Sequence, residues 1–203
     1  MKNPNIVKIV ALTLMVGALM PIRANANSGD RYVSNDTERP SNGAIHDYAT
    51  AKDPTIITFD VTGAGTDAFQ GTVPSGIAPD RSIVGFIRDA GVPSGTSRRG
   101  FLRDKNGTTT PFDAPGGGTG DDRGTLPASI NTNGAITGFI FDSSYVFHGF
   151  VRAKHGTITP FDPLGAGTDP GQGTVPGAIA PDGAITGYYV DSSYVFHGFL
   201  RNQ

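Results

Sequence analysis

The chain has no cysteine, only one glutamate (Glu38) and few lysines. The absence of cysteine excludes a disulfide framework and any metal site built from thiolates. Glutamate and lysine are good helix formers, and their scarcity, beside plentiful Gly, Thr, Val, Ile, Phe and Tyr, favours strands joined by tight turns. The composition therefore predicts an all-β protein held together by a packed core.

Long apolar runs are also lacking. The only one, Ile9–Met20, is 12 residues long, too short for a membrane-spanning helix, which needs about 20. Lys2 and Lys8 precede it and Ala24-Asn25-Ala26 follows it, which is the pattern of a cleaved signal peptide. We therefore expect residues 1–26 to direct the chain out of the cytoplasm, to a secreted or periplasmic location, with no membrane span afterwards.

Positive charge is scarce after the signal peptide. Removing Lys2, Lys8 and Arg23 leaves 13 basic against 18 acidic side chains, a net charge of −5. Nucleic-acid-binding proteins carry a basic surface, so a nucleic-acid partner is not expected.

The main positive feature of the chain is an internal repeat. The nonapeptide DSSYVFHGF occurs at 142–150 and again at 191–199, 49 residues later. It belongs to longer similar segments at 130–153 and 179–202, and a third copy at 77–104 carries four extra residues. A period near 49 with several short strands predicts a β-propeller-like array of about three four-stranded antiparallel units. A three-fold β-prism or trefoil is the alternative.

Turn residues place four strands in each unit. We expect the first at 177–181, the second at 184–190, the third at 194–201 and the fourth, from the preceding copy, at 157–162. A long glycine-rich connection, 163–176, would then follow. The third strand carries bulky apolar residues on both faces, which predicts that each unit stacks between two neighbours, because one unit cannot bury both faces alone.

The expected organisation follows from these copies. Residues 27–41 are polar and predict a flexible leader, and 42–203 form the repeat domain, with units at 42–70 (degenerate), 71–123, 124–172 and 173–203. Residues 55–60 read as a fourth strand without its own third strand. We expect this segment to pair with the third strand of the last unit and close a ring, or otherwise to leave an edge that favours a homo-oligomer.

The pattern N/D-G-A-I-T-G-F/Y followed by S-x-x-x-H-G-F-x-R, at 133–152 and 182–201, resembles the secreted bacterial HAF repeats. The resemblance covers about 42–203 and implies a β-propeller-like extracellular protein of unknown function. The copy at 77–104 departs from the pattern because Arg99 replaces the histidine. The resemblance therefore implies an architecture and not an activity.

Catalytic signatures are weak. His148 and His197 lie in separate units without a second histidine at metal-binding spacing, so we interpret them as packing residues bonded to a neighbouring carbonyl. No nucleophile motif is present. Aspartates could act as acid and base, which keeps one alternative open, a secreted hydrolase or lyase acting on polysaccharide. The leading expectation is an exported, non-enzymatic binding or assembly module.

One face is predicted to gather the turns after the second strands and the glycine-rich connections. Loop faces are where binding concentrates, and carboxylate and hydroxyl oxygens suit a neutral glycan or Ca²⁺. Two tyrosines at the border are expected to stack on sugar rings, and a protein ligand is a further option. Solvated turns without a ligand are the plainer interpretation. The candidate residues are Asp142, Ser143, Ser144, Tyr145, Asp191, Ser192, Ser193, Tyr194, Asp67, Asp121, Asp122 and Asp169.

Overall fold

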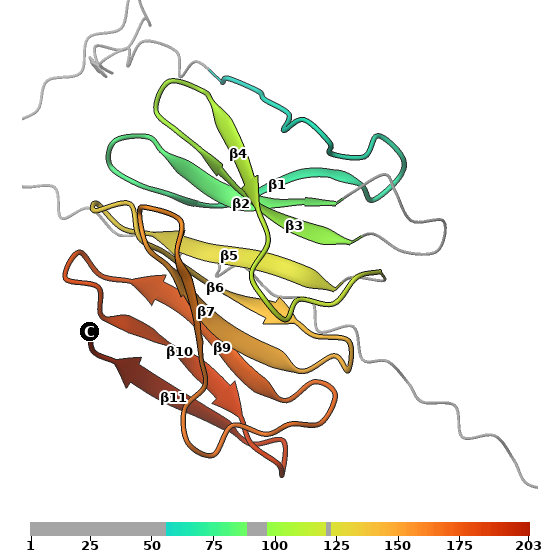
Figure 1. Ribbon diagram of the computed structural model, residues 1–203, viewed down its shortest axis with the longest axis vertical. Coiled ribbons are helices and arrows are strands. Elements are labelled where there is room, and N and C mark those ends of the chain that lie inside the picture. The colour runs from blue at the N-terminus through green and yellow to red at the C-terminus, as the bar shows by residue number, and fades with distance from the viewer. Residues whose placement is uncertain (1–55, 89–96, 121–122) are drawn as a thin grey trace, which may run out of the picture. The chain divides into compact units, whose positions relative to one another are not determined.

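A computed structural model describes residues 56–88, 97–120 and 123–203, which form eleven strands and no helix (Figure 1). This confirms the all-β prediction. The predictions for 1–26, 27–41 and residues 42–55 of the degenerate unit lie outside the described residues. The strands are β1 (Gly71–Ile77), β2 (Ile83–Arg88), β3 (Arg98–Arg103), β4 (Thr109–Phe112), β5 (Gly124–Ile130), β6 (Ile136–Phe141), β7 (Phe147–Arg152), β8 (Ile158–Phe161), β9 (Gly173–Ile179), β10 (Ile185–Val190) and β11 (Phe196–Arg201).

The strands follow the repeat. β1 to β4 and β5 to β8 are antiparallel meanders in which each strand pairs with the next. β9, β10 and β11 form a third unit with three strands. Four strands per unit are thus confirmed for the first two units.

The sequence predicted a separate sheet for each unit, and this prediction is wrong. All eleven strands belong to one mixed sheet, because the start of each third strand also pairs, in parallel, with the start of the next first strand. These bridges join Arg98 to Gly124 and Phe147 to Gly173. The first strand of the last unit therefore begins at Gly173 instead of 177, and the connection after β8 is shorter than predicted. Gly173 has φ +105°, and a Cβ there would collide with the Phe147 carbonyl oxygen, so the bridge requires glycine.

Neighbouring units pack through phenylalanines of the fourth strands. The ring of Phe112, in β4, lies edge-on to Phe150 of the second unit, with centroids 6.3 Å apart. Phe161, in β8, meets Phe199 of the third unit in the same way at 5.9 Å. Arg152 lies over the Phe112 ring at 4.9 Å, so its guanidinium adds a cation–π contact at the junction. Each fourth strand thus pairs within its own unit and packs on the next one.

The opposite face of each third strand is also covered. Phe147 packs beside Phe139, Leu126 and Val175, the last of which belongs to β9 of the following unit. Since Phe150 faces the preceding unit, β7 has an apolar neighbour on each side. In the second unit both faces of the third strand are thus covered by neighbouring units, as expected, whereas in the third unit β11 alternates between exposed and half-buried residues.

The predicted ring closure within one chain is wrong. Phe59 lies against Phe101 of β3 at 6.4 Å, with the Arg103 guanidinium 4.8 Å from its ring centre. The segment around Phe59 therefore packs on the first unit, in the way that Phe112 packs on the second. β1 and β11 lie at opposite ends of the strand order, and in the described part of the chain β11 pairs only with β10 (Figure 1). The described residues also include no helix long and apolar enough to cross a membrane.

Candidate binding face

The turn between β6 and β7 is a five-residue hairpin loop stabilised by its first side chain. The Tyr145 N–H donates to the Asp142 carbonyl at 3.2 Å, and the Asp142 N–H donates to the Val146 carbonyl at 3.1 Å. Asp142 Oδ1 accepts from the N–H groups of Ser144 and Val146, both at 2.8 Å. Aspartate favours such turns because its short side chain bonds the backbone two residues on.

The turn between β10 and β11 repeats this geometry. Asp191 Oδ1 accepts from the N–H groups of Ser193 at 2.8 Å and Val195 at 2.9 Å. The pKa of the Asp191 carboxyl lies below its ordinary value. The hydrogen bond from the Val195 N–H is the main cause, and the contact with His197 is the second.

Both turns place a tyrosine where this type of turn favours glycine. The fourth residue of the loop has positive φ, and it is Tyr145 at 62° and Tyr194 at 61°. A bulky side chain in this left-handed region costs about 1–3 kcal/mol. Arg81 is a further non-glycine example, at 70°. The equivalent turns elsewhere use glycine at this position: Gly107, Gly134, Gly156 and Gly183.

The two tyrosine rings are exposed at the surface. The Arg123 guanidinium lies 4.3 Å from the centre of the Tyr145 ring. The Tyr194 hydroxyl donates to the Pro170 carbonyl at 3.3 Å. The strained turns therefore present two exposed aromatic rings, and that of Tyr194 lies beside the glycine-rich loop.

That loop, residues 162–172, contacts both tyrosine turns, as predicted. The Gly171 N–H donates to the Tyr145 carbonyl at 2.8 Å, and the Gly167 N–H donates to the Val190 carbonyl, next to Asp191, at 2.9 Å. Asp169 lies in the same loop with an exposed side chain, and its N–H donates to Gln172 Oε1 at 3.0 Å. We call the Asp142–Tyr145 turn, the Asp191–Tyr194 turn and this loop the tyrosine face. Ser143 and Ser192 are exposed on it, whereas Asp121 and Asp122 lie outside the described residues.

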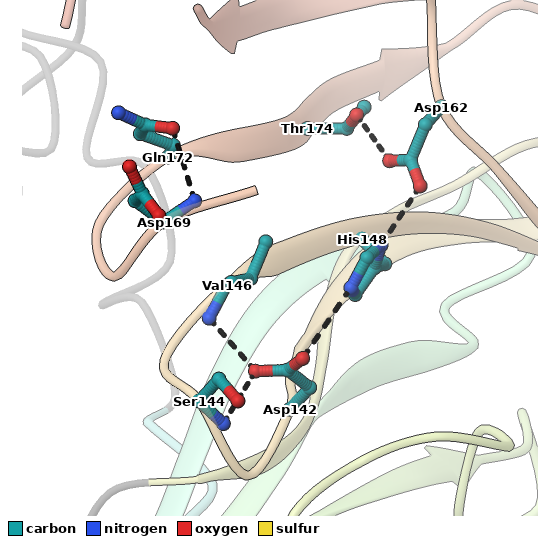
Figure 2. Close-up of polar contacts among 8 residues, drawn as sticks. All are labelled: Asp142, Ser144, Val146, His148, Asp162, Asp169, Gln172 and Thr174. Atoms are coloured by element: carbon teal, nitrogen blue, oxygen red, sulfur yellow. Dashed lines mark hydrogen bonds and ion pairs between the residues drawn. The ribbon is translucent and has the colours of Figure 1, made fainter. Parts of the chain in front are cut away.

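His148 links this face to the end of the fourth strand (Figure 2). Its Nδ1 lies 2.8 Å from Asp162 Oδ2, and its Nε2 lies 3.7 Å from Asp142 Oδ2. Asp162 also accepts a hydrogen bond from the buried Thr174 hydroxyl. The partners of His148 are thus carboxylates, and the predicted carbonyl partner is wrong.

The first unit repeats the His148–Asp162 contact with an arginine, whereas the third unit makes a different contact. In the first unit Arg99 takes the histidine's place, and its Nε lies 3.1 Å from Asp113, the counterpart of Asp162. In the third unit His197 Nε2 lies 3.1 Å from Asp191. Asp162 was missed by sequence reasoning, although the sequence offered a signal: Arg99 replaces a histidine while the aspartate after the fourth strand is retained.

The Thr174 contact has a local cause. In the first two units the equivalent threonines, Thr72 and Thr125, accept from the N–H groups of Val61 and Ala114 at 3.0 and 2.8 Å. The third counterpart is Pro163, which has no N–H to donate. The Thr174 hydroxyl therefore turns to Asp162.

Two aspartates of the tyrosine face, Asp142 and Asp191, are already engaged, whereas the Asp169 side chain is exposed. Asp142 and Asp191 each use Oδ1 for the turn and Oδ2 toward a histidine. Within the described ranges no group of three or more His, Asp or Glu side chains could hold a metal ion. At Asp142 and Asp191 a calcium ion would have to compete with these contacts, so the tyrosines are the stronger binding feature of the two turns.

No known protein family, curated protein or solved structure matches the chain. Its function is therefore argued from the tyrosine face itself.

Proposed function

We propose that the protein is an exported, non-enzymatic module with a β-propeller-like arrangement of HAF-type repeats, and that it binds a neutral glycan on the tyrosine face. The observation that carries this proposal is the positive φ of Tyr145 and Tyr194. A glycine there would relieve strain, as it does in the equivalent turns. Strain kept at a surface position supports a functional reason for the side chain.

A glycan suits the chemistry of this face. A tyrosine ring combines an apolar body, which can cover the C–H face of a sugar, with a polar hydroxyl. The exposed hydroxyls of Ser143 and Ser192 lie in the same turns and offer donors and acceptors for sugar hydroxyls. Residues 162–172 contact both turns, so one extended chain of sugars would reach both tyrosines.

One observation favours the alternative, a hydrolase or lyase: His148 lies between two carboxylates. The first unit makes the same ion pair with Arg99, and an arginine cannot act as a general base because it stays protonated. This comparison supports a structural role for the pair. Polysaccharide turnover abolished by Asp162→Asn, with the fold intact, would reverse that judgement.

The test separates strain from binding. Tyr145→Gly and Tyr194→Gly should each leave the free energy of unfolding unchanged or raise it by about 1 kcal/mol, because relief of strain exceeds the lost ring contacts. The same variants should lose glycan binding on an array of neutral oligosaccharides. Arg81→Gly is the matched control, because Arg81 has the same backbone conformation in the turn between β1 and β2. It should relieve strain and retain binding.

Tyr145→Phe and Tyr194→Phe keep the ring and should retain most of the affinity. Wild-type protein that binds no glycan, or glycine variants that bind as well as wild type, would refute the proposal.

A further inference from the structure

Two segments of the described chain lack the strand partner that their counterparts have. β11 pairs with β10 on one side only, and residues 56–60 belong to no strand. We propose that copies of this chain associate head to tail, with residues 56–60 of one copy pairing with β11 of another and completing its third unit.

The second unit shows what β11 lacks. There β7 has β6 on one side, and its other side carries β8 along Gly149–Arg152 and the start of β9 at Phe147. An exposed strand edge is a ready template for such pairing. Transferring the register from β7 places Gly198 opposite Phe59, Leu200 opposite Ile57, and Phe196 beside Gly71.

Residues 56–60 already occupy the position of a fourth strand relative to the following unit. Phe59 lies on Phe101 and under Arg103, as Phe161 lies on Phe199 and under Arg201. The segment is thus docked on its own first unit, and only its pairing with a preceding third strand is missing. Because it is held at the opposite end of the strand order from β11, a second copy is the occupant that fits.

Exposed apolar side chains mark both surfaces. Leu200 is 68% exposed and Ile57 is 75% exposed, and the transferred register sets them opposite each other. On the other side of the junction, inside the chain, Phe147 packs against the apolar cluster that contains Val175 of the next unit. Their counterparts Phe196 and Val73 are both exposed, so the proposed contact would cover them in the same manner.

Two glycines at the free ends, Gly198 and Gly71, have open space where their counterparts at the internal junction are crowded. A Cβ on Gly149 would lie 3.0 Å from the Phe161 carbonyl oxygen and from Thr174 Cγ2, whereas at Gly198 the nearest atom is 4.0 Å away. At the other end, a Cβ on Gly173 would collide with Phe147, whereas on Gly71 it would find its nearest neighbour 3.9 Å away. The residues that internal junctions require are therefore present at both free ends.

Two copies joined at both ends would contain six four-stranded units. Rings of four to eight such units are the usual range for propellers, and a head-to-tail contact forms a closed ring when its rotation allows. We therefore expect a two-copy ring, in which each copy supplies the fourth strand of the other.

Light scattering after size exclusion tests the assembly. The purified wild-type protein should elute at twice the mass of one chain. Gly198→Val should elute as a monomer with unchanged circular dichroism, since β11 has room for the added Cβ and valine favours strands. Leu164→Glu is the matched control: Leu164 is fully exposed in the glycine-rich loop and belongs to neither β11 nor residues 56–60, so this variant should remain assembled. A monomeric wild type across the micromolar range would overturn the proposal.

Cysteine pairs test the register, against a background without native cysteine. Mixing an Ile57→Cys variant with a Leu200→Cys variant should give a disulfide-linked dimer under mild oxidation, because opposed strand residues have suitable Cα separations. Each variant alone should give little. Cross-linking of Ile57→Cys with Phe199→Cys, whose side chain faces the other way, should be much weaker. Equal cross-linking of both pairs would overturn the register, and none in either would overturn the contact.

Discussion

The two copies of DSSYVFHGF have the same sequence and different surroundings. Val146 is 3% exposed in the second unit, and its counterpart Val195 is 49% exposed in the third. β7 is mostly buried or half-buried, whereas β11 alternates between exposed and half-buried residues. The difference arises because β8, β9 and the glycine-rich loop surround the first copy. Identical residues thus form identical strands, while burial depends on which neighbour is present.

The histidines of the two copies also differ in their surroundings. His148 meets the aspartate that follows its fourth strand, Asp162. His197 has no such partner among the described residues and contacts Asp191 of its own turn, while it stacks on Tyr189 at 4.9 Å. The same side chain therefore takes a long-range partner in one unit and a local partner in the other.

The largest expected contrast is between the phenylalanines of the third strands. Phe150→Ala should lower the free energy of unfolding by about 3–5 kcal/mol, because it empties a fully buried site against Phe112. Phe199→Ala should cost clearly less, since Phe199 is only half-buried. Urea denaturation at a concentration that keeps the protein monomeric would measure both. Equal losses would show that the third unit is covered in solution as the second is.

The valines of the nonapeptide should give a smaller contrast. Val146→Ala removes two buried methyl groups and should cost roughly 1–3 kcal/mol. Val195→Ala should stay within about 0.5 kcal/mol, as is usual for a surface position. The two variants can be compared in the same denaturation experiment. A large effect at Val195 would contradict its described exposure.

Substitutions of His148 should change the free energy of unfolding still less. His148→Arg reproduces the Arg99–Asp113 pair of the first unit, so the free energy of unfolding should change by less than about 0.5 kcal/mol. His148→Leu removes the ion pair and should be the more destabilising of the two. The reverse order would mean that the ion pair does not recur as a structural element.

The smallest expected effect is on the pH dependence of stability below pH 4, through the Asp191 carboxyl. The folded-state pKa of Asp191 lies below the ordinary value of 3.8, mainly because of the Val195 N–H. Its contribution to stability is therefore complete above pH 3.8 and is lost as the pH falls through the lower folded-state pKa. Asp191→Asn should make the protein slightly less sensitive to pH below 4. Carboxyl titration by NMR would check the direction, and a midpoint above 3.8 would contradict it.

The repeat, the turns and most of the strands could be predicted from the amino-acid sequence, although β9 begins at Gly173, before the predicted residue 177. A hairpin depends on residues close in the chain, so Asp142 and Asp191 could be recognised as turn residues from their neighbours alone. The apolar residues on both faces of the third strand also predicted stacking between units, because one unit alone cannot bury both faces.

The contacts that join the units could not be predicted from local sequence. The parallel bridge from Phe147 to Gly173, the docking of Phe59 on the first unit and the pairing of His148 with Asp162 connect residues 14 to 42 positions apart. No local pattern encodes these distances. They follow from which surfaces remain to be covered once the hairpins have formed. That is why β7 consists of buried and half-buried residues, whereas β11, with the same first four residues, alternates between exposed and half-buried ones.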